Sequence, residues 1–74
     1  MFNIDKATLE TLRNKFTSGT RVELVHMNDI QAPPIGTKGT VKSVDDMGTI
    51  HIRWDSGSSL GVVYGEDVCK IVKE

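Results

Sequence analysis

Two closely spaced glycine turns separate runs of alternating apolar residues in the segment 36–57, GTKGTVKSVDDMGTIHIRWDSG. Gly48 and Gly57 follow aspartates in connections where a type I turn with a G1 bulge needs a residue at positive φ. The run between the turns alternates Ile50 and Ile52 with polar residues, which is the period of a strand with one buried face. This feature predicts antiparallel hairpins and restricts the chain to a small β fold.

Similar alternating runs flank this segment, and together they predict a barrel. The expected strands are 21–27, 38–44, 49–54, 59–65 and 68–72. Pro33 and Pro34 cannot donate ladder hydrogen bonds, so we expect a long loop between the first two strands. Closing short strands on themselves removes exposed edges and joins their apolar faces in one core. The pattern therefore predicts a mainly β fold, an SH3-like small five-stranded antiparallel barrel.

The first part of the chain follows a helical period instead. Its apolar positions are Ile4, Leu9, Leu12 and Phe16. Asp5 stands before this run as an N-cap, and Gly19 stands after it as a stop just past the last turn. We therefore expect one domain in which residues 1–19 form a helix packed on the barrel of residues 20–74.

Composition excludes several classes of protein. The formal net charge is −1, so the chain lacks the dense positive field of a non-specific nucleic-acid binder. Its one cysteine, Cys69, can form neither an internal disulfide nor a zinc quartet. We expect Cys69 to be a small buried hydrophobe, and we expect no metal, no other cofactor and a cytoplasmic location. No apolar run resembles a signal peptide or reaches the roughly 20 residues of a membrane span, so no membrane association is expected.

Three short motifs carry a resemblance to a known family. They lie at 32–37 (APPIGT), 39–41 (GTV) and 51–60, the last running from His51 through Trp54 to Leu60. On these motifs the segment 21–72 resembles an uncharacterised bacterial family, domain of unknown function 4314. More distantly, its strand–turn–strand core is similar to KOW-type motifs and other SH3-like modules. The resemblance implies an SH3-like barrel found in Gram-positive bacteria, their phages and conjugative elements, and it assigns no activity.

One position departs from that family pattern. Tyr64 stands where a proline is expected before Gly65. The departure affects the surface near Gly65 and leaves the expected fold unchanged.

The loop 27–35 is the first candidate binding site. Its apolar residues are Met27, Ile30, Pro33, Pro34 and Ile35. The resemblance implies that this loop borders the ligand groove of an SH3-like barrel, and exposed apolar patches tend to mark contacts. We therefore predict a binding or adaptor module that engages a protein or peptide through this loop and the adjacent barrel mouth. The alternative is that Ile30 and Ile35 tuck under the loop as a satellite core, against the helix.

A cationic surface is the second candidate. Its residues are Arg21, Lys38, Lys42, His51 and Arg53. Such a surface suits phosphate groups, and the KOW-like core favours a nucleic-acid-associated accessory domain of a phage or mobile element. The net charge and the low aromatic content disfavour this hypothesis, because base stacking needs exposed aromatic rings. A third hypothesis is a homodimer in which the helix or an edge strand pairs with its copy.

Other distinctive residues have structural explanations. Trp54 is in phase with Ile50 and Ile52, so we expect it in the core. Asp55 is expected to bond the backbone of its own turn. His26 and His51 have no flanking nucleophile motif, and no phosphate-binding loop is present. We therefore expect a protein that is not an enzyme.

Overall fold

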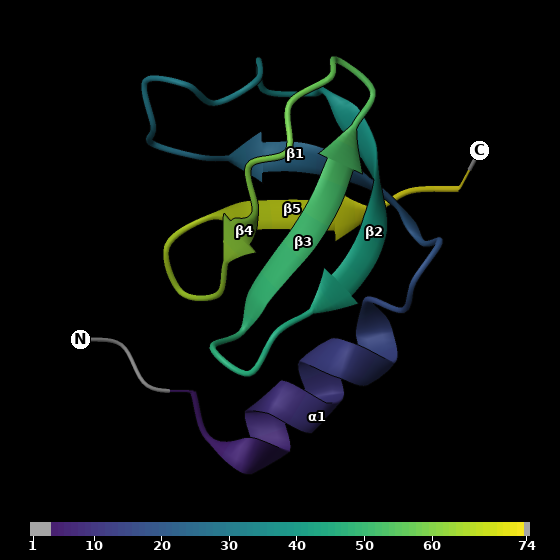
Figure 1. Cartoon of the computed structure of the whole chain (residues 1–74), viewed down its shortest axis with the longest axis vertical. Helices are drawn as coiled ribbons and strands as arrows, with labels where there is room; N and C mark the ends of the chain where they lie inside the picture. Colours follow the sequence, from purple (N-terminus) through teal and green to yellow (C-terminus); the bar gives the residue numbers. More distant parts are fainter. Residues whose placement is uncertain (1–3, 74) are drawn as a thin grey trace.

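The computed structural model describes residues 4–73, which form one helix and one five-stranded antiparallel sheet (Figure 1). The elements are α1 (Lys6–Lys15), β1 (Arg21–His26), β2 (Lys38–Val44), β3 (Thr49–Trp54), β4 (Val62–Val63) and β5 (Val68–Ile71). The strand order across the sheet is β4-β3-β2-β1-β5, so β5 returns to pair with β1. The predicted fold class, mainly β with an N-terminal helix, is confirmed.

The predicted closure of the five strands into a barrel is corrected, because the sheet curls but stays open at one seam. β4 and β5 are its two ends, and no ladder joins them in the described part of the chain. β4 is shorter than the predicted strand 59–65. Residues 58–60, which precede it, accept hydrogen bonds from Trp54 that belong to no strand ladder. The backbone N–H of Trp54 donates to Ser58 O at 3.1 Å, and its indole Nε1–H donates to Leu60 O at 2.7 Å. After β4 a turn begins at once, closed by the N–H of Asp67 on Val63 O at 2.9 Å.

Both predicted glycine turns are confirmed. Gly48 has φ of 84° and Gly57 has φ of 97°, values that a residue with a side chain rarely adopts. A register shift between Val41 and Ser43 lies in the ladder of β2 with β3. Such a bulge strengthens the local twist, which helps a short sheet to curl.

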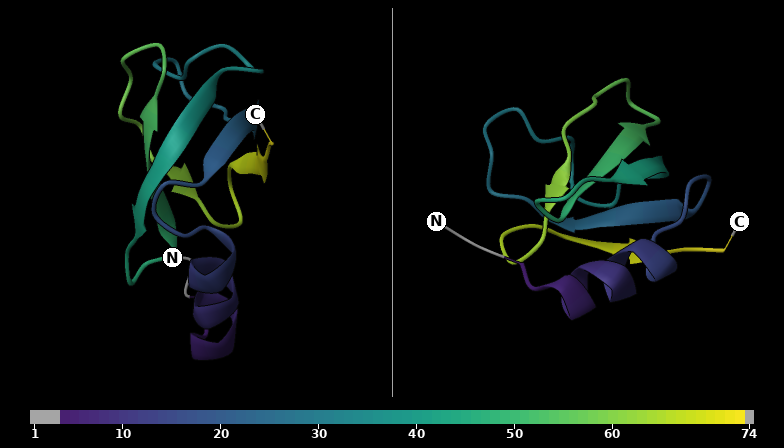
Figure 2. Two further views of the ribbon diagram at one scale, coloured as in Figure 1. Left: turned by 90° about the vertical axis from the view of Figure 1, so that its right-hand side faces the viewer. Right: turned by 60° about the horizontal axis from the view of Figure 1, so that its bottom comes forward.

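The helix begins where the sequence predicts. The Asp5 carboxylate accepts a hydrogen bond from Thr8 N–H at 2.7 Å. Hydrogen bonding to the Thr8 side chain, followed by that to the Thr8 backbone, lowers the pKa of Asp5. Helix α1 ends at Lys15, followed by Phe16, so the predicted stop at Gly19 is wrong. Gly19 instead lies in the next turn, which Thr20 N–H closes on Thr17 O, and it has φ of 92° there. Figure 2 shows α1 lying against one end of the sheet.

The core gathers the inward faces of the strands and one face of α1. Its buried residues are Leu12, Phe16, Val22, Leu24, Val41, Ile50, Ile52, Trp54 and Val62. Trp54 is 1% exposed, which confirms its predicted place in the core. Gly39 faces it across the sheet, and a Cβ there would lie 2.7 Å from Ile52 Cγ2 and 2.8 Å from Trp54 Cε3. The indole therefore needs glycine at position 39. Fully burying a large apolar side chain stabilises the folded state by roughly 1.5–3 kcal/mol.

Candidate interaction surfaces

The loop between β1 and β2 is fixed by backbone hydrogen bonds. Leu24 of β1 donates its N–H to Thr37 O at 2.8 Å and accepts from Gly36 N–H at 2.9 Å. Inside the loop, Asp29 O accepts from Ala32 N–H at 3.0 Å. The Asp29 carboxylate also accepts from the N–H two residues further on, at 2.8 Å. The loop therefore presents its side chains from an ordered frame.

The apolar side chains of this loop divide into two groups. Ile30 is fully exposed at the turn that Asp29 closes, Ile35 is 61% exposed, and Pro34 is also exposed. Pro33 is buried, and Met27 is half-buried against the core. The alternative in which Ile30 and Ile35 form a satellite core is therefore wrong. In Figure 1 the loop lies at the end of the molecule opposite to α1, so the loop is not placed to pack on the helix.

Arg21, the first of the five candidate cations, is neutralised by an acidic partner. Its guanidinium donates to both carboxylate oxygens of Asp55, at 2.9 and 2.6 Å, and to Thr40 Oγ1 at 2.9 Å. These bonds, with a contribution from the charge of Lys38, hold the pKa of Asp55 below its ordinary value. The prediction that Asp55 bonds its own turn is corrected, because the carboxylate instead links this turn to β1.

His51 also has an acidic partner. Its Nε2 lies 2.8 Å from Asp45 Oδ2, while Asp45 Oδ1 accepts from Met47 N–H at 3.0 Å and Thr49 N–H at 2.9 Å. The hydrogen bond from His51, followed by that from the Thr49 backbone, lowers the pKa of Asp45. The imidazole is thus engaged in the β2–β3 turn.

Lys42 and Arg53 are the remaining members of the predicted cationic surface. Both are exposed, Lys42 at the bulge of β2 and Arg53 on the neighbouring strand, where it faces Thr40 in the ladder. With Arg21 and His51 facing carboxylates and Lys38 close to Asp55, the sheet surface carries a small positive field.

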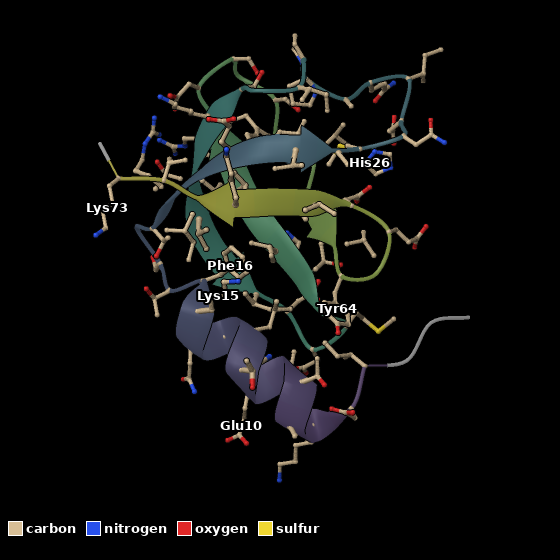
Figure 3. The ribbon with its side chains drawn as sticks, turned by 180° about the vertical axis from the view of Figure 1, so that it is seen from behind. Glu10, Lys15, Phe16, His26, Tyr64 and Lys73 are labelled. Atoms are coloured by element: carbon tan, nitrogen blue, oxygen red, sulfur yellow. The ribbon has the colours of Figure 1, made fainter. Side chains whose placement is uncertain are left out.

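A groove between α1 and the β4–β5 region was not predicted from the sequence. It encloses about 450 Å³, and its apolar lining includes Leu12, Phe16, Val62, Val68 and Cys69. In Figure 3, Lys15 and Phe16 lie between α1 and β5, and Tyr64 lies at the other end of the same gap. The groove lies at the seam where β4 and β5 do not pair. It forms only where α1 packs near these strands, so local sequence patterns do not predict it.

The rim of the groove is charged at both ends. The Lys15 ammonium lies 5.5 Å from the centre of the Phe16 ring, a cation–π distance that keeps it at the rim. Glu66 and Asp67 line the groove on the side of the β4–β5 turn. Burial raises the pKa of the Cys69 thiol to about 11, so this cysteine is a neutral apolar wall rather than a reactive thiolate.

Within residues 4–73, no three His, Cys, Asp or Glu side chains gather in a way that could hold a metal ion. Within the same residues, no helix has the length and hydropathy to cross a membrane.

Comparison with known proteins identifies one family. A family model described as Domain of unknown function (DUF4314) matches residues 5–72, which includes α1 and every strand. No curated protein matches the chain.

Proposed function

The chain belongs to the DUF4314 family, and from its surface we propose that it is a non-catalytic binding module that engages a protein or peptide through the loop 27–35. The exposure of Ile30 carries this proposal. Exposing a branched aliphatic side chain forfeits the free energy that its burial would supply, so such side chains cluster where a partner covers them.

The order of the loop strengthens the proposal. Backbone bonds at Leu24, Gly36 and Asp29 fix the frame that carries Ile30, Pro34 and Ile35. A frame that is ordered before binding loses little conformational entropy when a partner docks. We place this activity in the cytoplasm, because the only cysteine is unpaired.

The experiment replaces both exposed isoleucines with aspartate. The Ile30→Asp, Ile35→Asp double variant should retain the melting temperature of the wild type and lose proteins captured from the native host. Met47→Asp is the matched control, since Met47 is 60% exposed on a different turn. Unchanged capture by the double variant would refute the proposal.

A second candidate function is nucleic-acid binding as an accessory domain of a phage or mobile element. The observation that favours it is the exposure of two cations, Lys42 and Arg53, on the paired strands β2 and β3. In that case Lys42→Glu with Arg53→Glu should abolish binding to duplex DNA or RNA, and wild-type affinity should fall steeply with added salt. Equal binding by the double variant and the wild type would remove this candidate.

A further inference from the structure

The molecule carries an apolar projection and an apolar recess on separate parts of its surface. The projection is Ile30, fully exposed at a turn of the β1–β2 loop. The recess is the groove beneath α1, lined by Leu12, Phe16 and Val68. Figure 1 shows the loop and α1 at opposite ends of the long axis, so the two features of one molecule cannot meet each other.

The sizes of the two features are compatible. A recess of about 450 Å³ exceeds the volume of one aliphatic side chain, so it can take Ile30 together with part of its neighbouring turn. Val68 is 49% exposed at the recess, so apolar area remains there for a second molecule to cover.

The charges select an orientation. Asp29 is the only charged residue among residues 27–35, and it directly precedes Ile30. Lys15 provides a cation on one side of the recess, while Glu66 and Asp67 place negative charge on the side of the β4–β5 turn. An inserted Ile30 is therefore favoured with Asp29 toward Lys15 and away from Glu66.

We propose that the partner of the loop is a second copy of this chain, whose α1–β5 groove receives Ile30 with Asp29 facing Lys15. This inference rests on the proposed function, because it names the protein that the loop binds. The contact joins different patches on the two copies, so it is heterologous and adds copies head to tail. The small area involved makes the association weak and concentration-dependent.

Sedimentation velocity over a concentration series up to about 1 mM tests the proposal on the full chain. Wild-type protein should shift from monomer to larger species as concentration rises. Ile30→Asp removes the projection, and Val68→Glu places a charge in the groove. Each variant alone should weaken self-association by about tenfold or more. Thr11 is an exposed residue of α1 that lines the groove. If Val68→Glu is unstable, Thr11→Trp should fill the groove and weaken self-association in its place.

Mixing the variants gives the sharpest result. Ile30→Asp retains an intact groove and Val68→Glu retains an intact loop, so the mixture should form a one-to-one dimer that grows no further. Wild-type protein that remains monomeric throughout the series overturns the proposal. A wild type that associates while the mixture stays monomeric also overturns it, because the contact then lies elsewhere.

The ion pair has its own test. Asp29→Asn keeps the side-chain oxygen that accepts the loop hydrogen bond and removes only the charge. Asp29→Asn and Lys15→Gln should each weaken association by about threefold, and the double variant should weaken it no further. Additive losses would overturn the pairing of Asp29 with Lys15.

The failure of this inference can be told apart from the failure of the proposed function. If the wild type is monomeric but Ile30→Asp with Ile35→Asp loses a captured host protein, the loop binds a different partner and only the inference falls. If the double variant changes neither self-association nor capture, both fall.

Discussion

The two connections that flank β2 use their side chains in opposite ways. In the turn between β2 and β3, the Asp45 carboxylate serves two backbone N–H groups and His51. In the loop between β1 and β2, the backbone is satisfied by its own hydrogen bonds, and Ile30 projects into solvent. The Asp45 side chain therefore stabilises its own turn, whereas the Ile30 side chain packs on nothing in its loop and stays accessible to the partner that we propose.

Trp54→Ala should give the largest loss of unfolding free energy. Trp54 is buried at the end of β3, the strand that follows the Asp45 turn. Removing a fully buried aromatic ring costs about 3–5 kcal/mol of unfolding free energy. For a domain of 74 residues this is much of the total stability, so urea denaturation should show a largely unfolded population.

Trp54→Phe is the control for that substitution. It keeps an aromatic ring beside Gly39 but loses the indole hydrogen bond to Leu60 O. The loss in unfolding free energy should be clearly smaller than for Trp54→Ala. Equal losses would show that the hydrogen bond, rather than ring burial, dominates at this position.

Asp45→Ala should give the next largest effect. It removes the acceptor for Met47 N–H and Thr49 N–H and the partner of His51. Because the Asp45 side chain is 40% exposed, water replaces part of this loss, and we expect a cost of about 1–2 kcal/mol in urea denaturation at pH 7.

The same carboxylate should make stability depend on acid pH. Its pKa in the folded protein lies below the ordinary value of 3.8, so the folded state binds a proton less readily than the unfolded chain. The stabilising contribution is fully present above the unfolded pKa and is lost as the pH falls through the folded pKa. Between about pH 4 and pH 2, the unfolding free energy of the wild type should therefore fall more steeply than that of Asp45→Asn. Parallel curves for the two proteins would contradict this role for Asp45.

Substituting Gly48 in the β2–β3 turn and Gly36 in the β1–β2 loop compares the backbones of the two connections directly. Gly48 and Gly36 both have positive φ, so alanine at either position is strained by about 1 kcal/mol. At Gly48 a new Cβ would also lie 2.9 Å from Ile4 Cδ1, whereas at Gly36 it meets nothing within 4 Å. Chemical denaturation should therefore find Gly48→Ala more destabilising than Gly36→Ala. The reverse order would mean that Ile4 moves aside without cost.

The sequence predicts the β2–β3 turn better than the β1–β2 loop, because features that depend on neighbouring residues can be read locally. The glycines at 48 and 57, the cap at Asp5 and the burial of Trp54 each follow from neighbouring residues and strand period, and the structure confirms them. The partner of Asp55 is Arg21, which lies 34 positions away, so no local rule could find it. The groove likewise depends on α1 packing near β5. The exposure of Ile30 depends on the path of the whole loop.

Ile30→Ser should have the smallest effect on folding, and that is what makes it informative. A fully exposed side chain gives up almost no buried area when it is shortened, so the unfolding free energy should change by less than about 0.5 kcal/mol. Val22→Ser, on the buried face of the adjoining strand, is the matched comparison and should be strongly destabilising. A thermal denaturation series on the two variants separates the roles. If Ile30→Ser destabilised the domain as Val22→Ser does, the loop would belong to the core and would offer no free surface for a partner. If it leaves stability intact, any binding that it abolishes is a property of the exposed side chain itself.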